Sequence, residues 1–398
     1  MTSRLDPRVV PQAAVYVGDT LAAHLTRTGN DIEFRYTENY LATGGPAVAT
    51  TLPLGEEPVI TRAGAVPPYF AGLLPEGRRL TALRTAVKAS ADDELSLLLA
   101  VGADPVGAVA VLPVGTTPTV PIPRVTVDAT EHLDFATVLA AAGVPDPVAL
   151  AGVQDKVSAR TLAVPVDIAG SDAILKLSPP EFPGLVDNEW ACYRFSRRNR
   201  LRIAYAAARR ITDMSGRAGL LVSRFDRPEA GKLPVEDVSQ LLGIWPAQKY
   251  SVTMEQVADV VARTCSSPVL ALRQVAFQLA MAWLSGNGDL HAKNISVLHD
   301  GHGFSPSPIY DIPSTVPYGD HDLALSVGGS TTGFTRKRFN SFTDAVGLPR
   351  SVADSLADEA LRLTERAPEL ISEAAGFDPR RVRDLRRVLT SRRRHWDR

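Results

Sequence analysis

One short segment of this 398-residue chain has residue types and spacing suited to moving a phosphoryl group. Asp289 is followed five residues later by Asn294, in a loop that leads into a run of β-forming residues. In loops that catalyse phosphoryl transfer, an Asp at this spacing accepts or orients the attacking hydroxyl, and the Asn carbonyl oxygen binds magnesium. Asp311, beyond the next expected strand, would supply the main magnesium carboxylate, because a hard cation prefers oxygen ligands. We expect the three side chains to share one ion.

The same segment also allows a purely structural interpretation. Asp289 follows Gly-Asn-Gly and could be a turn residue or a helix N-cap, while Asn294 could be an amide at a strand edge. Two further polar residues in the loop, His291 and Lys293, could contact phosphate or could pack the loop. The context favours the catalytic interpretation, because an amphipathic helical pattern precedes the loop and a β-hairpin pattern follows it.

A lysine in an apolar strand indicates where the phosphates of a nucleotide would be held. Lys176 lies in the run Ala-Ile-Leu-Lys-Leu, and burial of an unpaired ammonium is costly, so the strand predicts an anionic partner. Glu189, in the first turn of an expected helix, could be this partner, as in the Lys–Glu pair of kinases. The alternative is that Lys176 lies on an edge strand and extends its ammonium to water.

Two other segments would complete a nucleotide site. A short loop before residue 157 could cover phosphates with its backbone amides, although its one glycine is a weaker signal than a glycine-rich loop. The residues concerned are Gly152, Val153, Gln154, Asp155 and Lys156. The expected strand over 219–225 ends at Phe225, whose ring could form an apolar wall for the base. A core strand without ligand contact explains that segment equally well.

The elements that must position these residues are of mixed type. Short β-rich runs and turn residues over 14–54 predict a small antiparallel sheet, and a helical pattern follows around 68–99. Prolines dominate 112–124, which indicates a linker. Strands and a helix are expected over 135–225, and helices thereafter, most clearly over 271–285.

Composition excludes several classes of protein. Hydrophobic residues make up 45% of the chain and charged residues 22%, which excludes full-length disorder and collagen. The formal net charge is -1, so no molecule-wide field attracts nucleic acid or an anionic membrane. The two cysteines, Cys192 and Cys265, are far apart, which fits a reducing cytoplasm and excludes a thiolate zinc site. The amino terminus has no apolar stretch of signal-peptide length, and residues 97–114 contain Asp-Pro and two glycines, so neither export nor a membrane span is expected.

With these pieces in this order, the sequence resembles the HipA-type serine/threonine protein kinases, which are toxins of bacterial type II toxin–antitoxin systems. The likeness spans nearly the whole chain and rests on short motifs whose joint order and spacing are specific. In the first domain these are Val15-Tyr16-Val17, Phe34-Arg35-Tyr36 and residues 69–77. In the remainder they are residues 151–156, Ile174-Leu175-Lys176, Asn188-Glu189, Arg224-Phe225-Asp226-Arg227, Glu236-Asp237 with Gln240, Lys249-Tyr250, residues 289–294 and Tyr310-Asp311-Ile312.

The resemblance implies an α+β, protein-kinase-like bilobed fold with a small β-rich N-terminal domain and a mostly helical C-terminal lobe. The domain boundaries that we expect are 1–113 for the small domain, 114–124 for the Pro-rich linker, 125–226 for the nucleotide-binding lobe and 227–398 for the helical lobe. It also implies ATP- and Mg²⁺-dependent phosphorylation of a protein Ser or Thr hydroxyl, with aminoacyl-tRNA synthetases as targets and growth arrest as the outcome in known members.

By matching motif, the resemblance assigns a role to each candidate residue. Asp289 would be the catalytic base, and Asn294 and Asp311 the magnesium ligands. Lys176, held by Glu189, would contact the nucleotide phosphates. Residues 152–156 would form the phosphate-covering loop, with Phe225 at the adenine and with His291 and Lys293 as further nucleotide neighbours.

Two departures from the family pattern are visible. Some members carry a regulatory serine just before the phosphate loop, whereas residues 149–152 here (Ala-Leu-Ala-Gly) offer no hydroxyl, so that switch is expected to be absent. Ser158 could take the place of this regulatory serine, but nothing else in the sequence supports that role. The acid that often precedes Arg-Phe-Asp is Ser223 here, so the contact to the base would rely on the backbone.

The basic carboxyl end allows two interpretations. Residues 380–398 hold nine arginines against two aspartates and could contact nucleic acid, but a solvated helix end is the interpretation that we favour.

Two rival functions are compatible with the same residues. One is a non-catalytic, nucleotide-binding co-repressor that acts with a DNA-binding antitoxin. The other is a small-molecule phosphotransferase that uses the same Asp–Asn–Asp site.

Overall fold

The computed structural model describes residues 6–90, 92–118, 126–127, 134–141, 162–168, 171–229 and 231–396. The chain forms two compact units. Unit 1 comprises Met1–Ile122, Asp226–Lys249 and Leu298–Asp300, and unit 2 comprises Pro123–Phe225, Tyr250–Val297 and Gly301–Arg398. The domain boundaries expected from the sequence stay a prediction, since compact units and functional lobes are different divisions of the chain.

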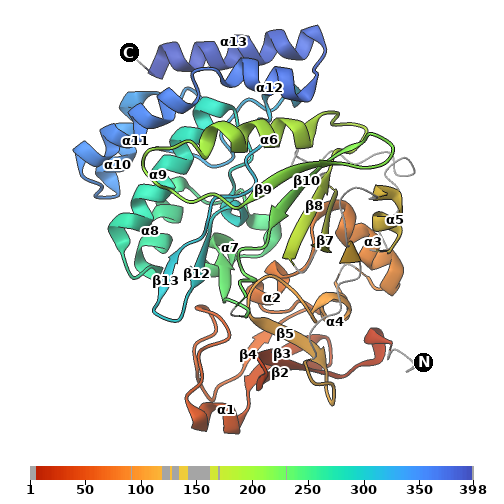
Figure 1. Cartoon of the computed structure of the whole chain (residues 1–398). Coiled ribbons are helices and arrows are strands. Elements are labelled where there is room, and N and C mark those ends of the chain that lie inside the picture. Colours follow the sequence, from red (N-terminus) through yellow and green to blue (C-terminus); the bar gives the residue numbers. More distant parts are fainter. Residues whose placement is uncertain are drawn as a thin grey trace. The chain divides into compact units, whose positions relative to one another are not determined.

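Unit 1 is built on an antiparallel five-stranded sheet with the strand order β4-β3-β2-β1-β5. Its strands are β1 (Gln12–Val17), β2 (Thr20–Thr28), β3 (Asp31–Tyr36), β4 (Val59–Thr61) and β5 (Val109–Pro113). Ile32, Phe34 and Tyr36 alternate along β3 into the core, as a strand with one buried face requires. The small β-rich N-terminal domain is thus confirmed (Figure 1).

The helical pattern expected around 68–99 forms three separate helices. They are α2 (Pro68–Gly72), α3 (Gly77–Val87) and α4 (Glu94–Val101), and the unit also contains η1 (Pro7–Val9) and α1 (Glu38–Thr43). Asp93 begins α4 by accepting the backbone N–H of Ser96, which is the usual cap for the free amides of a first turn. Lys88 ends α3 in the left-handed conformation, with φ 57°.

A later part of the chain belongs to unit 1 and brings a buried carboxylate into it. This part holds β11 (Val235–Asp237), α7 (Val238–Leu241) and η5 (Pro246–Gln248). Glu236 accepts hydrogen bonds from the Thr50 backbone amide at 2.9 Å and from the Thr50 hydroxyl at 2.8 Å. Burial raises the pKa of Glu236 to about 7, although both bonds from Thr50 act to lower it.

Unit 2 begins with a second sheet, in the strand order β6-β7-β8-β10-β9. Its elements are β6 (Thr126–Val127), α5 (Phe135–Ala141), β7 (Leu162–Ile168), β8 (Ser171–Leu177), α6 (Leu185–Ser196), β9 (Ala208–Thr212) and β10 (Ala218–Ser223). One face of the sheet packs on Phe135 of α5, and the other on Val186 and Tyr193 of α6. The strand expected over 173–177 is confirmed within β8.

Helices form most of the remainder of unit 2. They are α8 (Met254–Thr264), α9 (Pro268–Ser285), α10 (Arg336–Ala345), α11 (Arg350–Leu363), α12 (Ala367–Ala375) and α13 (Pro379–Trp396). The shorter elements are η6 (Ala292–Asn294), β12 (Ser296–His299), β13 (Phe304–Pro306) and η7 (Val316–Tyr318). The last two residues of β12 belong to unit 1. Helix α6 packs against α12 and β10 (Figure 1). In the described ranges, no helix combines the length and apolar character that crossing a bilayer needs.

Candidate nucleotide site

The structure gives the strand lysine two carboxylate partners. Lys176 Nζ donates to Glu189 Oε1 at 2.8 Å, to Glu189 Oε2 at 3.0 Å and to Asp311 Oδ1 at 2.8 Å. Strand β8 lies between β7 and β10, so the alternative of an edge-strand lysine is wrong. Lys176 pairs with Leu220 across the sheet and therefore shares the face that α6 covers. This places the first turns of α6 where Glu189 can reach it.

The charges of the two carboxylates keep Lys176 protonated. Burial disfavours the protonated form of Lys176, but the carboxylates of Asp311 and Glu189 outweigh it and raise the pKa of the lysine above its ordinary value. Burial raises the pKa of the Glu189 carboxyl, and the Lys176 ammonium acts in the opposite direction. The lysine is therefore a cation at physiological pH, held between one fully buried and one partly exposed carboxyl.

A neighbouring amide ties the Asp311 segment to α6. Asn188 Nδ2 donates to the Ser314 carbonyl at 2.7 Å, and the Ser314 amide donates to Asn188 Oδ1 at 3.0 Å. Asp311 itself has a left-handed backbone, with φ 57°, which costs a non-glycine residue about 1 kcal/mol. Such a conformation persists where surrounding contacts determine it. The Asn188 clamp is one of these contacts.

The loop that carries Asp289 begins where α9 ends. Gly286 closes α9 with φ 80°, a conformation that glycine adopts without strain. Asn287 Oδ1 then accepts the backbone amide of Asp289 at 2.9 Å, so Asn287 makes the local turn and Asp289 keeps its side chain for other contacts. The Thr315 backbone amide donates to the Gly286 carbonyl at 2.8 Å, and Thr315 Oγ1 accepts the Gly288 amide at 2.9 Å. The segment with Thr315, which is distant in sequence, thus helps to hold the turn.

The carboxylate of Asp289 is buried and accepts a hydrogen bond from Tyr250. The Tyr250 hydroxyl lies 2.8 Å from Asp289 Oδ1. Asn294 Nδ2 donates to the Asp289 carbonyl at 2.8 Å, which closes the loop on itself. The ring of His291 is buried edge-on against Tyr250, with ring centroids 5.0 Å apart. The five-residue spacing therefore creates a compact loop in which Asp289 is oriented by its neighbours.

Two side-chain oxygens in this region fit a magnesium ion. Asn294 Oδ1 and Asp311 Oδ2 accept no hydrogen bond from any described residue, since the partner of Asn294 is on its nitrogen and that of Asp311 is on Oδ1. Over the same ranges, no group of three or more His, Cys, Asp and Glu residues is arranged to hold a metal. Mg²⁺ commonly takes one or two protein oxygens and completes its shell with phosphates and water. The donor set fits that mode, and the sharing of one ion by all three residues stays a prediction.

The remaining candidate residues have different positions. Phe225 lies beside Tyr310, with ring centroids 5.7 Å apart, on the cluster that α6 covers. The backbone carbonyl of Lys293 accepts the Tyr310 hydroxyl at 2.8 Å. The proposed phosphate loop, Gly152 to Lys156, and Ser158 lie outside the described residues, so the roles assigned to them stay predictions.

The basic carboxyl end forms α13, and its apolar residues pack as a helix end on the lobe would. Leu385, Leu389 and Trp396 are buried. Two arginines are structural as well. Arg392 is buried, and Arg393 donates to the Leu361 carbonyl at 2.6 Å. These contacts support the favoured interpretation of this segment as a helix end.

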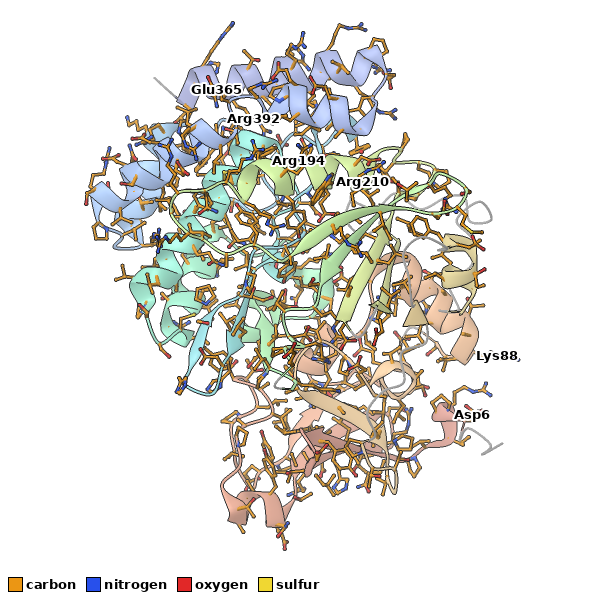
Figure 2. The ribbon with its side chains drawn as sticks, viewed as in Figure 1. Asp6, Lys88, Arg194, Arg210, Glu365 and Arg392 are labelled. Atoms are coloured by element: carbon orange, nitrogen blue, oxygen red, sulfur yellow. The ribbon has the colours of Figure 1, made fainter. Side chains whose placement is uncertain are left out.

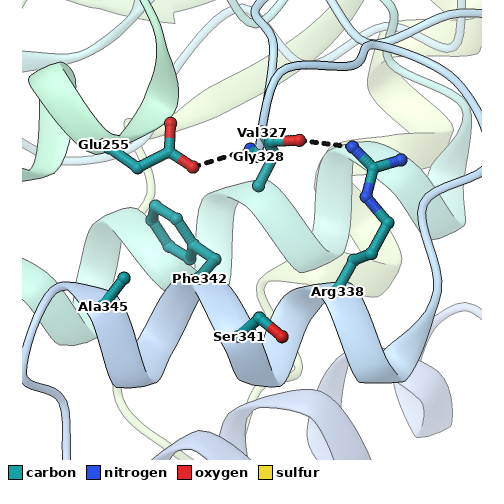
Figure 3. A pocket seen from close by; sticks show the side chains of 7 residues that line it. All are labelled: Glu255, Val327, Gly328, Arg338, Ser341, Phe342 and Ala345. Carbon is teal, nitrogen blue, oxygen red and sulfur yellow. Dashed lines mark hydrogen bonds between the residues drawn. The ribbon is translucent and has the colours of Figure 1, made fainter.

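A pocket of about 290 Å³ lies at the start of α8 and along α10 (Figure 3). The polar groups at its rim are already used, since Glu255 accepts the Gly328 amide and Arg338 donates to the Val327 carbonyl. None of the candidate site residues that the structure describes lines it.

Sequence reasoning missed four residues that shape the site. They are Asn188, Tyr250, Asn287 and Thr315. Tyr250 and Asn188 lie in segments already matched to the family, but a tyrosine or an asparagine by itself does not reveal its partner. Asn287, between two glycines ahead of Asp289, had a local signal, because Asn in such a turn commonly accepts an amide two residues on.

Comparison with known proteins found matching family models and relatives. Residues 148–367 match the HipA-like C-terminal domain family and residues 13–112 match the HipA N-terminal domain family. A Sinorhizobium fredii protein named "Putative kinase Y4mE" is 28% identical over 381 residues, covering 87% of this chain and 90% of that protein. The serine/threonine-protein kinase toxin HipA of Shewanella oneidensis is 25% identical over 394 residues, covering 90% and 88%.

The fold is also shared with a solved structure. The HipA chain in the complex of Shewanella oneidensis HipA, HipB and operator DNA superposes with a TM-score of 0.76 at 21% identity, covering 96% of this chain and 97% of that one. The expected α+β, protein-kinase-like fold is confirmed. The chain belongs to the HipA family.

Proposed function

We propose that this protein is a toxin kinase that transfers the γ-phosphoryl group of ATP to a Ser or Thr hydroxyl of a cellular protein. The observation that carries the proposal is the convergence of Lys176, Glu189 and Asp311 in one ion-paired cluster. A lysine held in this way by a glutamate and placed beside a metal-binding aspartate is the arrangement that kinases use for nucleotide phosphates. Two relatives of this chain are named as kinases, which also supports the proposal.

Each residue has a defined task in this proposal. Asp289, oriented by Tyr250, would accept the proton of the attacking hydroxyl. Lys176 would exchange part of its contact with Asp311 for the phosphates, while Glu189 keeps the ammonium in place. Asn294 and Asp311 would hold Mg²⁺, which neutralises phosphate charge when bound. Catalysis would depend on positioning and electrostatics, with no covalent protein intermediate.

The biological setting is part of the same proposal. We infer an aminoacyl-tRNA synthetase as the protein target, growth arrest as the outcome, and a site of action in the cytoplasm, where ATP is supplied. The solved relative was crystallised with HipB and operator DNA. This supports a DNA-binding antitoxin as a partner of the present protein.

The first experiment tests the transfer itself. Purified protein is incubated with γ-labelled ATP, Mg²⁺ and a cell lysate, and the labelled band is identified. Asp289→Ala should lower the transfer rate by about 10²–10⁴-fold, because the group that accepts the proton is lost. Asp259→Ala, at an exposed position on α8, serves as the matched control. An Asp289→Ala variant that still labels protein and arrests growth at wild-type levels would defeat the proposal.

The same assay separates the two rival functions. Label on a metabolite rather than on protein indicates a small-molecule phosphotransferase. ATP binding without any labelled product indicates the co-repressor, and operator binding with an antitoxin would then be the activity to measure.

A further inference from the structure

The carboxyl-terminal helix places a buried arginine beside the catalytic loop. Arg392 of α13 is 7% exposed, and its guanidinium carbon lies 3.9 Å from the centroid of the Trp283 ring. Nη1 donates to the Trp283 carbonyl at 2.6 Å, and Nη2 donates to the His321 carbonyl. Figure 2 labels this residue, which belongs to α13.

Within the part of the chain that the structure describes, the charge of Arg392 is balanced only at longer range. None of the described carboxylates lies within ion-pair distance of it, and its direct acceptors are two backbone carbonyls. Burial lowers the pKa of Arg392 to about 10, while the charges of Asp322 and Asp320 act against that change. It remains a cation at neutral pH. A buried cation without a direct carboxylate partner is costly, so its retention calls for a specific role.

The first contact completes the end of α9. The last carbonyls of a helix lack partners within the helix and need another donor when they are buried. The Ala282 carbonyl is used by the amides of Gly286 and Asn287. The next carbonyl, that of Trp283, is taken by Arg392. A cation at this position also interacts favourably with the helix dipole.

The second contact joins the same helix end to the segment after Asp311. The Asp320 carbonyl, next to the His321 carbonyl that Arg392 binds, accepts the Thr315 hydroxyl at 2.8 Å. Thr315 in turn holds Gly286 and Gly288. Arg392 and Thr315 therefore tie the same two segments together on either side of the turn that presents Asp289.

We propose that Arg392 is a positioning residue that caps α9 and holds the Gly286–Gly288 turn, so that the C-terminal helix supports the catalytic loop. The expected effect of Arg392 on the rate of phosphoryl transfer rests on the proposed kinase function. The guanidinium is suited to this task because its planar fork reaches two carbonyls while its face stacks on an indole. A lysine could satisfy only one carbonyl well, and a methionine neither.

The kinetic test compares Arg392→Met and Arg392→Lys with Arg394→Met, an exposed arginine on the same helix. A displacement of about 1 Å at the reacting group lowers rate on the order of 10²-fold. Arg392→Met should lower kcat by that order and leave the KM for ATP within about threefold, because Lys176 and Asp311 keep their own contacts. Arg392→Lys should recover part of kcat, and Arg394→Met should behave as wild type. Equal kcat in folded wild-type and Arg392→Met protein would overturn the proposal.

Hydrogen exchange supplies a readout that does not depend on catalysis. In Arg392→Lys, amides of residues 283–290 should exchange about tenfold faster than in wild type, with α8 amides unchanged. Unchanged exchange at 283–290 refutes the positioning role, and this variant decides the matter if Arg392→Met does not fold. A wild-type protein that transfers no phosphate, yet shows this exchange difference, contradicts the proposed function and leaves the positioning role supported.

Discussion

The buried ion pair between Lys176 and Glu189 allows a demanding test of the site. Glu189 is 1% exposed on its side chain and Lys176 is 12% exposed. Removal of one member of a buried pair leaves the other charge without compensation, at a cost of about 3–5 kcal/mol. Lys176→Met should lie at the upper end of this range, because Glu189 then has no cation. Glu189→Leu should lie at the lower end, because Lys176 keeps its 2.8 Å contact with Asp311.

The double variant Lys176→Met/Glu189→Leu distinguishes this reasoning from simple loss of packing. A buried pair replaced by apolar residues of similar volume is often neutral in stability. We therefore expect the double variant to unfold at higher urea than Lys176→Met, while both lack phosphoryl transfer. Urea denaturation at pH 7 measures the free energy of unfolding, with the exposed Lys337→Met as the control. Additive losses in the double variant would refute the interpretation of a coupled buried pair.

The pH dependence of Lys176→Met supplies an independent check with a defined sign. Burial already raises the pKa of Glu189, and loss of the lysine removes the main opposing charge. A carboxyl whose folded pKa is raised stabilises the fold fully below its unfolded pKa, about 4.3, and loses that contribution as pH rises through the folded value. The free energy of unfolding of Lys176→Met should therefore fall from pH 5 to pH 8 more steeply than that of wild type. Parallel curves for the two proteins would contradict the argument.

Three further perturbations have defined outcomes. Burial raises the pKa of Glu236 from 4.5 to about 7, so wild-type stability should decline by up to about 3 kcal/mol as pH rises from 5 to 8. Urea denaturation should show that Glu236→Gln removes this decline and that the exposed Glu56→Gln retains it. Gly288→Ala should abolish most activity, because its Cβ would lie 2.6 Å from a backbone oxygen. The Cβ of Gly55→Ala meets no atom within 4 Å, so this variant is the control. Wild-type rates in both variants would contradict the prediction. Tyr250→Phe removes the hydroxyl that donates to the candidate catalytic carboxylate, so kcat should fall about tenfold or more, and an unchanged kcat would exclude an orienting role.

Much of the site could be read from local sequence. The five-residue spacing from Asp289 to Asn294 sets a short loop, and its neighbouring patterns of helix and hairpin are local as well. The need of Lys176 for an acid followed from the cost of burying charge. Local patterns did not give every detail, since the helical pattern over 68–99 did not reveal that this stretch forms three helices rather than one. The phosphate loop over 152–156 and the domain boundaries stay predictions.

Tertiary structure alone decided which side chains meet. Tyr250 reaches Asp289 over 39 residues, Arg392 reaches Trp283 over 109 and Asn188 reaches Ser314 over 126. Periodicity and spacing report on contacts within a few residues, because they follow from the geometry of single helices and strands. Partners brought together by packing carry no comparable signal in one sequence. The residue types capable of chemistry were therefore evident from the sequence, and the contacts that orient them came from the packing of elements distant along the chain.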